Sequence, residues 1–201
     1  VTGEEWGNFL CELFDVWYEK DTRRVSIRLF DSVMALLVDG RPNICHMGTD
    51  CCQYFLVEYN GDVYPCDFYA DPEWQLGNIM THSWDEMLNS PLYKKFGERK
   101  TECNEKCKSC EYYMFCAGDC QKNRPMKGRM ASAVSPLCDG WKMFYSHTLD
   151  RFKILASEVK EERRQKELLW RDTIRLAENH SMNQLCPCGS GRKYKKCCGR
   201  K

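Results

Sequence analysis

The crowding of cysteines constrains this chain more than any other feature of its sequence. There are 15 cysteines among 201 residues, and five of them lie within residues 103–120. The total is odd, and the cysteines fall into Cys-x2-Cys, Cys-x-Cys and Cys-Cys groups. Such groups favour metal ligation over disulfide pairing. We therefore expect thiolate ligands to organise much of the fold.

Residues 103–120 admit two incompatible interpretations. Counted from Cys103, they contain C-x3-C-x2-C, the spacing by which radical S-adenosylmethionine (SAM) enzymes hold a catalytic iron–sulfur cluster. Counted from Cys107, they read C-x2-C-x5-C-x3-C, a run of ligands with no open iron. The second interpretation is favoured, because too few residues follow for a SAM-binding barrel and Ser109 stands where an aromatic residue often precedes the last cysteine. It leaves Cys103 as a spare thiol.

Composition and charge indicate a soluble, cytoplasmic protein. Hydrophobic residues make up 43 % of the chain, enough for a core in one domain with a small appendage. No apolar run is long enough to cross a membrane, and no charged leader precedes one. The net charge is +1, but residues 142–201 carry 15 basic and 7 acidic side chains, so an acidic body ends in a basic tail. Because the chain begins at Val1 inside a helical pattern, we expect it to be the C-terminal part of a longer protein.

The pattern of apolar residues predicts helices towards both ends of the chain. Residues 4–19 have apolar side chains at helical spacing, while residues 25–30 alternate as in a short strand. Ser83 opens a Ser-x-x-Glu capping box, and Pro91 occupies an allowed first position of a helix. The pattern in residues 142–180 predicts a long helix or a helix pair.

A β-hairpin is expected over residues 54–66. Two strand-like runs flank Asn60-Gly61, the pair that best tolerates the positive φ angles of a two-residue turn. Such a turn pairs Phe55 with Cys66. Cys51 and Cys66 then emerge at the same open end, where both could bind one ligand.

Eight cysteines of the body follow one another at spacings that chance would not produce. From the second onwards they read C-x9-G-x4-C, a gap, C-x2-C-x5-C-x3-C, a gap, and C. Eight thiolates are the number that two [4Fe-4S] clusters need when each is held by four cysteines. The eight are Cys45, Cys51, Cys66, Cys107, Cys110, Cys116, Cys120 and Cys138.

These residues resemble the SPASM domain, the auxiliary-cluster domain of peptide-modifying radical SAM enzymes. Within that group they are most similar to the anaerobic sulfatase-maturating enzymes. The closer resemblance rests on Asn-Gly-Asp-Val-Tyr-Pro-Cys-Asp-Phe at residues 60–68, Leu-Gly-Asn at 76–78, Cys-Ala-Gly-Asp-Cys at 116–120 and the following Asn123-Arg124. It covers roughly residues 1–150.

The resemblance implies two interleaved auxiliary [4Fe-4S] clusters with full cysteine ligation. It assigns one cluster to Cys45, Cys51, Cys66 and Cys120, and the other to Cys107, Cys110, Cys116 and Cys138. Neither would have an iron open to SAM, so their expected roles are electron transfer and ordering of the domain. SAM and a third cluster are expected in an N-terminal barrel that this sequence lacks, so the chain alone should be inactive.

The resemblance also singles out Asp67, which follows the ligand Cys66. It implies that Asp67 is the general base that deprotonates a cysteine or serine of a sulfatase polypeptide during oxidation to formylglycine. An alternative role for Asp67 is to accept backbone hydrogen bonds around the cluster loop. Two alternative functions also stay open: a SPASM domain serving another peptide modification, and a non-catalytic iron–sulfur or zinc interaction module.

The tail forms a second ligand group, C-x-C-x8-C-C, over residues 186–198. Four thiolates in so short a segment suit a closed structural zinc site, and metal must supply its folding energy. The segment resembles the SEC-C motif, with Cys186, Cys188, Cys197 and Cys198 as ligands. Basic residues surround it, so we expect it to dock on an acidic protein, or alternatively on ribosomal RNA. A solvated basic terminus is the simpler alternative.

The expected fold class is therefore α+β. We divide the chain into the edge of a radical SAM barrel (1–40), a SPASM domain with a small antiparallel hairpin and cluster-binding loops (41–141), a helical linker (142–182) and a zinc knuckle (183–201).

Overall fold

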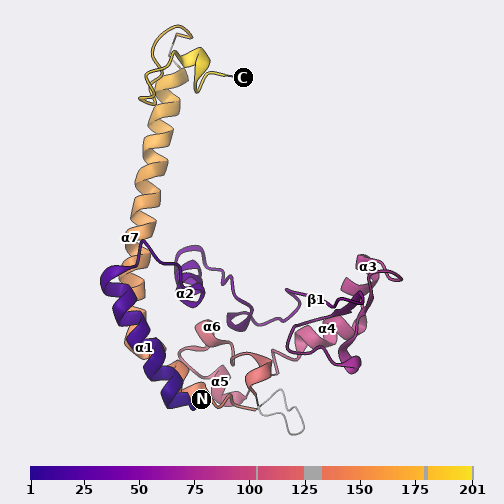
Figure 1. Cartoon of the computed structure of the whole chain (residues 1–201). Helices are drawn as coiled ribbons and strands as arrows, with labels where there is room; N and C mark the ends of the chain where they lie inside the picture. The colour runs from indigo at the N-terminus through magenta and orange to yellow at the C-terminus, as the bar shows by residue number, and fades with distance from the viewer. Residues whose placement is uncertain (103, 125–132, 179–180, 201) are drawn as a thin grey trace. The chain divides into compact units, whose positions relative to one another are not determined.

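The computed structural model describes residues 1–102, 104–124, 133–178 and 181–200. The described chain consists of helices and one small antiparallel sheet (Figure 1), which confirms the α+β class. It divides into two compact units, Val1–Phe152 and Lys153–Lys201, and each is described by itself. Cys103 lies outside the described residues.

The helices vary from three residues to forty-one. The α-helices are α1 (Gly3–Lys20), α2 (Arg28–Asp39), α3 (Trp84–Leu88), α4 (Pro91–Glu98), α5 (Glu105–Lys108), α6 (Tyr113–Cys116) and α7 (Cys138–Glu178). Short 3-10 turns are η1 (Cys45–Met47), η2 (Pro72–Trp74), η3 (Gln121–Asn123) and η4 (Tyr194–Lys196). The sheet has the order β1 (Leu56–Val57), β2 (Asp62–Tyr64), β3 (Gly77–Asn78).

Helix α1 confirms the prediction for residues 4–19. It begins with a capping box in which the Thr2 hydroxyl accepts from the Glu5 amide at 3.2 Å and the Glu5 carboxylate accepts from the Thr2 amide at 2.8 Å. Its inward face buries Leu10, Phe14 and Trp17, as the helical spacing of the apolar residues requires.

The strand expected at residues 25–30 is wrong, because α2 begins at Arg28. The apolar residues here continue at helical rather than alternating spacing, and Phe30 and Val33 are completely buried. Three alternating residues cannot be told apart from the approach to an amphipathic helix. The Trp17 indole donates to the Val25 carbonyl at 2.8 Å and fixes the connection between α1 and α2.

A cluster of aromatic rings joins α1, α2 and the first turns of α7. Phe14, Phe30, Phe144 and Phe152 are completely buried. The ring centroids of Phe14 and Phe152 lie 4.6 Å apart, and those of Phe30 and Phe144 lie 5.8 Å apart. Full burial of one such ring stabilises the fold by about 1.5–3 kcal/mol, so these four rings together contribute strongly to the stability of the first unit.

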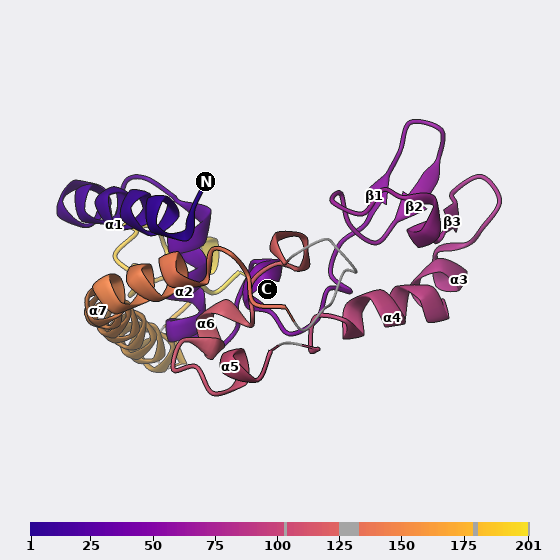
Figure 2. The same ribbon diagram turned by 90° about the horizontal axis from the view of Figure 1, so that it is seen from below.

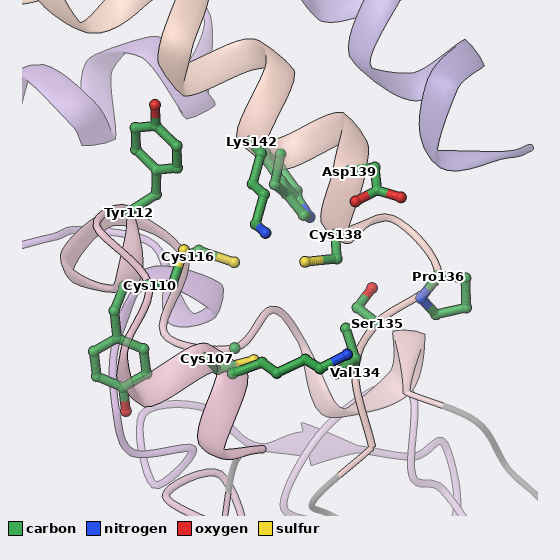
Figure 3. A pocket seen from close by; sticks show the side chains of 14 residues that line it. Cys107, Cys110, Tyr112, Cys116, Val134, Ser135, Pro136, Cys138, Asp139 and Lys142 are labelled. Atoms are coloured by element: carbon green, nitrogen blue, oxygen red, sulfur yellow. The ribbon is translucent and has the colours of Figure 1, made fainter.

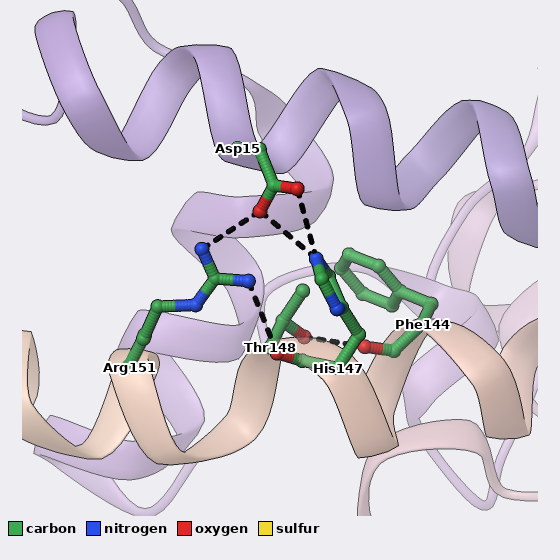
Figure 4. A network of polar contacts seen from close by, with 5 residues as sticks. All are labelled: Asp15, Phe144, His147, Thr148 and Arg151. Carbon is green, nitrogen blue, oxygen red and sulfur yellow. Dashed lines mark hydrogen bonds and ion pairs between the residues drawn. The ribbon is translucent and has the colours of Figure 1, made fainter.

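A polar network ties α1 to α7 at the edge of the aromatic cluster. The Asp15 carboxylate on α1 lies 2.7 Å from the Arg151 guanidinium and 2.9 Å from His147 Nε2, both on α7 (Figure 4). The Arg151 guanidinium also lies 4.7 Å from the centroid of the Phe14 ring, a cation–π contact. The contacts of Asp15 lower the pKa of its carboxyl group, against the effect of burial.

Glycines allow α1 and α7 to approach each other closely in both ribbon views (Figures 1 and 2). A Cβ atom added to Gly140 would lie 2.1 Å from the Gly3 carbonyl oxygen, and one added to Gly7 would lie 2.8 Å from the Gly140 Cα. The two backbones are therefore in contact, and this places the start of α7 against α1.

The hairpin forms, but its turn and register differ from the prediction. Its pairs are Leu56 with Tyr64 and Val57 with Val63. The Gly61 amide donates to the Glu58 carbonyl at 2.9 Å, which closes a three-residue loop. The predicted pairing of Phe55 with Cys66 is therefore wrong by one residue.

The physical reason lies in the backbone of Asn60-Gly61. The type I′ turn that Asn-Gly favours needs positive φ at both positions, but of this pair only Gly61 has it, with φ +87°. The Asn60 side chain instead accepts from the Asp62 amide at 3.0 Å, which stabilises the longer loop. A glycine in this conformation at the end of a three-residue loop is the usual bulged form of the hairpin.

The remaining helix predictions are confirmed. Ser83 and Glu86 form both bonds of the capping box of α3, and Ser90 caps α4 ahead of Pro91. The pattern from residue 142 belongs to the single helix α7, which begins at Cys138; residues 179–180 lie outside the described part. Across the described residues, no helix combines the length and apolarity needed to cross a membrane.

Replacing Gly140 with Ala should destabilise the first unit. The added methyl group has no space against the α1 backbone, and overpacking of this kind costs about 1–3 kcal/mol. Urea denaturation followed by circular dichroism would measure the change. Ser146→Ala, on the exposed face of the same helix, is the matched control and should change the unfolding free energy by less than about 0.5 kcal/mol. Equal stability of both variants would contradict the close crossing.

Candidate metal centres

Two cavities in the first unit are each lined by four of the eight body cysteines. The larger one has a volume of about 330 Å³ (Figure 3). We call its cysteines site two: Cys107, Cys110, Cys116 and Cys138. The smaller one has a volume of about 80 Å³. We call its cysteines site one: Cys45, Cys51, Cys66 and Cys120.

Helices bring the four cysteines of site two together. Cys107 lies on α5, Cys110 follows that helix, Cys116 ends α6, and Cys138 is the first residue of α7. Figure 3 shows these side chains around one open space, with the Lys142 side chain extended towards it from the next turn of α7. The sequence assignment of these four to one centre therefore groups residues that also lie together in space.

Loops rather than helices carry most of site one. Cys45 opens η1, Cys66 follows β2, and Cys120 precedes η3. Aromatic side chains that include Tyr54, Tyr69 and Phe96 complete the cavity wall. Although the hairpin register differs from the prediction, Cys51 and Cys66 do line the same cavity.

The two sites suit a multi-atom cluster better than a single ion. In the described part of the chain, one group of His, Cys, Asp or Glu side chains lies close enough to hold a single metal ion, and it is in the tail. Sites one and two instead surround a hollow with four thiols each. Four thiolates around an enclosed space match the donor set of a [4Fe-4S] cluster.

The segment 116–120 carries the chain from one site to the other through three left-handed residues. Ala117, Gly118 and Asp119 have φ angles of +46°, +76° and +65°. This conformation costs about 1–2 kcal/mol for each residue with a side chain. The left-handed conformation turns the chain so that Cys116 lies at site two and Cys120 at site one, although only three residues separate them.

Hydrogen bonds from buried groups hold this segment in place. The Asp119 carboxylate accepts from the Cys120 amide at 2.7 Å, the Asn123 amide group at 3.0 Å and the Ser135 hydroxyl at 2.6 Å. The Lys100 ammonium group donates to the Asp119 carbonyl at 3.0 Å. Arg124 Nε donates to the Gly118 carbonyl at 3.2 Å.

Lys100 is the feature that sequence reasoning missed. It is 1 % exposed, and its ammonium group also donates to the His46 carbonyl at 2.8 Å. Burial lowers the pKa of Lys100, whereas the neighbouring Cys51 and Cys120 act in the opposite direction. A lysine in a charged surface-like stretch gives no sequence signal of burial, so pattern reasoning could not have found it.

Asp67 lies at the rim of site one. It is exposed, yet it lines the cavity, and its carboxylate accepts from the Cys66 thiol at 3.3 Å. The side chain is therefore accessible both to the site and to a molecule arriving from solvent, as a general base for an external substrate must be.

Burial favours the protonated form of five of the eight thiols when no metal is bound. It raises the pKa of Cys66 and of Cys116 to about 12, and it also raises the pKa of Cys51, Cys120 and Cys138. Ligation requires thiolates, so loading either site must release protons.

The tail cysteines form a compact third group in the second unit. The sulfurs of Cys186, Cys188, Cys197 and Cys198 all lie within 4.8 Å of one another. Tetrahedral zinc with bonds of about 2.3 Å places its sulfurs about 3.8 Å apart, so the group fits zinc with little movement. Gly189 and Gly191 have φ angles of +77° and +69°, a conformation that glycine adopts readily and that lets the segment turn between its ligand pairs.

Comparison with known families identifies two modules in the chain. Residues 45–111 match SPASM, an iron-sulfur cluster-binding domain, and residues 182–200 match the SEC-C motif. The chain therefore contains an iron–sulfur cluster-binding domain of the SPASM family, followed by a SEC-C motif, as the sequence resemblance indicated.

Over its SPASM region the chain is homologous to anaerobic sulfatase-maturating enzymes. It is 34 % identical over 161 residues to the serine-type enzyme of Bacteroides thetaiotaomicron, covering 79 % of this chain and 39 % of the relative. It is 33 % identical over 159 residues to the cysteine-type enzyme of Clostridium perfringens (strain ATCC 13124), covering 78 % and 43 %. The chain thus spans about two fifths of the length of these relatives.

Solved structures agree with this relationship. Native anSMEcpe with bound AdoMet and Kp18Cys peptide superimposes with a TM-score of 0.73 at 34 % identity, covering 79 % of this chain and 44 % of that chain. Native anSMEcpe with bound AdoMet and Cp18Cys peptide gives a TM-score of 0.74, covering 80 % and 45 %. The fold described above is therefore the fold of a corresponding part of a sulfatase-maturating enzyme.

The thiols of the metal-free chain should differ strongly in their reactivity. In the gathered tail, hydrogen bonding by Ser190 and the neighbouring thiols lowers the pKa of Cys188 to about 6. If the tail unfolds without metal, this exposed thiol returns only to the ordinary cysteine pKa of about 8.5, still far below the pKa of the buried thiols. Cys66 and Cys116 are almost entirely thiols, and the thiolate is the reactive form. We expect iodoacetamide to alkylate Cys188 at least about 100-fold faster than Cys66 or Cys116, as measured by peptide mass spectrometry.

The alkylation rates of the buried and the exposed thiols should also depend differently on pH. Below their pKa, the alkylation rates of Cys66 and Cys116 should rise about tenfold for each unit of pH, whereas that of Cys188 should level off by about pH 9 whether or not the tail is folded. The urea-denatured chain is the control, since all its thiols should then react at similar rates. Equal rates for Cys116 and Cys188 in the native chain would contradict the buried sites.

Proposed function

We propose that this chain supplies the auxiliary-cluster part of a radical SAM enzyme that oxidises a cysteine or serine of a sulfatase to formylglycine. The observation that carries the proposal is the division of eight cysteines between two cavities, four in each, within the region homologous to sulfatase-maturating enzymes. The substrate would be a sulfatase polypeptide. SAM and a third cluster would bind to a barrel domain of the complete enzyme.

Each site would hold one [4Fe-4S] cluster. Site one would use Cys45, Cys51, Cys66 and Cys120, and site two would use Cys107, Cys110, Cys116 and Cys138. When bound, such clusters supply one-electron transfer. Four thiolates at each site leave no vacant iron position, so neither site would activate SAM.

Asp67 would act as the general base. Oxidation of the substrate side chain would remove two electrons and two protons, as one hydrogen atom taken by the radical that SAM supplies, one proton taken by a base and one electron taken by an acceptor. A serine would give the aldehyde directly, whereas a cysteine would give a thioaldehyde that water hydrolyses to the aldehyde with loss of hydrogen sulfide. The Asp67 carboxylate is exposed at the rim of site one, where it can receive that proton. Because Asp67 lies at site one, the proton and the electron would leave the substrate towards the same part of the protein.

The knuckle would hold a structural zinc ion through Cys186, Cys188, Cys197 and Cys198, whose sulfurs are already gathered. Arg192, Lys193, Lys195 and Lys196 lie between the two ligand pairs. This charge favours docking of the knuckle on an acidic protein surface, with ribosomal RNA as the alternative partner.

A SPASM domain serving another peptide modification is the second candidate. The chain is also 29 % identical over 98 residues to the mycofactocin maturase MftC of Mycobacterium ulcerans, covering 48 % of this chain and 25 % of the relative. The longer and closer matches to sulfatase-maturating enzymes favour the first candidate.

Removing one ligand from either site should halve the iron content. Anaerobic reconstitution of the chain should give about eight irons, and Cys51→Ala or Cys107→Ala should each leave about four. Cys52→Ala is the matched control beside Cys51, and Cys103→Ala tests the rejected SAM-cluster spacing; both should retain about eight. Quantification of iron, sulfide and zinc would measure this. About four zincs and no iron would instead indicate an interaction module.

Replacing Asp67 with Asn should abolish turnover without affecting the clusters. Loss of a general base lowers the rate by about 10²–10⁴-fold, while all eight thiol ligands remain. The test would use the complete enzyme with SAM, reductant and a sulfatase peptide, and would measure formylglycine by mass spectrometry and iron in parallel. Asp85→Asn, on exposed α3, is the control. A fully active Asp67→Asn enzyme would remove Asp67 from the mechanism.

A further inference from the structure

Two buried charges of opposite sign lie in the protein between site one and site two. Lys100 and Asp119 are each 1 % exposed, and they are linked through the hydrogen bond from the Lys100 ammonium to the Asp119 carbonyl. Burying charged groups is costly unless they are well bonded. The proposed electron and proton transfers do not by themselves explain why a cation is kept here.

The Lys100 ammonium is bonded to the backbone of two segments that carry cysteines of site one. Its two acceptors are the carbonyls of His46 and Asp119, and these residues are the direct chain neighbours of Cys45 and Cys120. Burial raises the pKa of the Cys51 thiol, and the Lys100 charge lowers that pKa more than any other group does. The ammonium is therefore held beside three of the four ligands of site one.

The Asp119 carboxylate reaches towards site two. One of its oxygens accepts from the Ser135 hydroxyl, and Ser135 lines the cavity of site two. Burial is the main cause of the raised pKa of the Cys116 thiol, and the charge of Asp119 raises this pKa further, by more than the charge of Lys100 lowers it. In each of the three hydrogen bonds described above, the Asp119 carboxylate is the acceptor, as expected for an ionised group.

Asp119 also acts at site one, because its carboxylate accepts from the Cys120 amide and its charge raises the pKa of the Cys120 thiol. Lys100 lowers that pKa by more than Asp119 raises it, so the positive charge dominates there. Lys142 extends towards site two, but it is exposed and therefore screened by water and salt. Arg124 is buried and donates to the Lys100 carbonyl at 3.4 Å, so it adds a second positive charge beside Lys100 rather than a compensating negative one. Buried charges act more strongly than exposed ones because the local dielectric constant is lower.

We propose that Lys100 raises the reduction potential of the cluster bound at site one, and that Asp119 lowers the potential of the cluster bound at site two. This inference rests on the proposed function, because it concerns the centres that the two sites would hold. A nearby cation stabilises the reduced, more negative state of a cluster, and an anion does the opposite. The two residues would thus direct the electron of the substrate to site one, beside Asp67.

The test compares charge variants of Lys100 in the whole chain with one site loaded at a time. Cys107→Ala leaves only site one loaded, and Cys51→Ala leaves only site two loaded. In the first background, Lys100→Gln keeps a donor for the carbonyls but removes the charge. Its reduction equilibrium should shift at least tenfold towards the oxidised form, or about 59 mV for one electron. Redox titration followed by electron paramagnetic resonance would measure the shift.

Control variants separate charge from structure. In the site-one background, Lys100→Arg keeps the charge and should leave the potential within threefold of the parent equilibrium. With only site two loaded, Lys100→Gln should have a smaller effect than with only site one loaded, and Asp119→Asn should shift the equilibrium towards the reduced form. Lys142→Met, which removes an exposed charge at site two, should shift it less than Asp119→Asn does.

Two outcomes would overturn the inference. An unchanged site-one potential in a fully loaded Lys100→Gln chain would show that the charge has no effect, and loss of iron in both Lys100 variants would make Lys100 purely structural. If instead Cys51→Ala and Cys107→Ala do not each leave about four irons, the proposed ligation itself fails. The iron content therefore distinguishes failure of this inference from failure of the proposed function.

Discussion

The turn from Cys116 to Cys120 is the constraint on which the rest of the metal-binding region depends. Three consecutive left-handed residues reverse the chain so that cysteines only four positions apart line different cavities. Such a segment is strained by itself, and the buried groups around it compensate by bonding its carbonyls and the Asp119 carboxylate. Residues from distant parts of the sequence are thereby fixed relative to both sites.

Cysteine spacing allowed the ligand groups to be predicted, because ligation requires particular atoms at particular separations. The eight body cysteines and the four tail cysteines lie in the groups that the sequence suggested, and their role as ligands stays a proposal. Helices marked by caps, at Thr2, Ser83 and Ser90, were equally readable, since a cap is a local interaction between neighbouring residues. Local signals of this kind survive folding because tertiary contacts do not have to create them.

Features that depend on tertiary contacts could not be read in the same way. Residues 25–30 alternate like a strand, but burial of Phe30 against α1 and α7 decides for the helix α2. The hairpin register depends on whether one residue, Asn60, adopts positive φ. Burial of Lys100 arises only when the segments around Cys45 and Cys120 meet, so no periodicity reveals it.

Cys138 belongs to two structural features: it lines site two, and it is the first residue of α7. Two residues further on, Gly140 contacts the α1 backbone, and the aromatic cluster begins with Trp141 and Phe144. Under the proposed ligation, metal occupancy and helix packing would be linked equilibria, in which each stabilises the other. A cell short of iron or sulfide would then also hold a chain whose helical core is less resistant to proteolysis, so that turnover of the polypeptide would report on the supply of its cofactor.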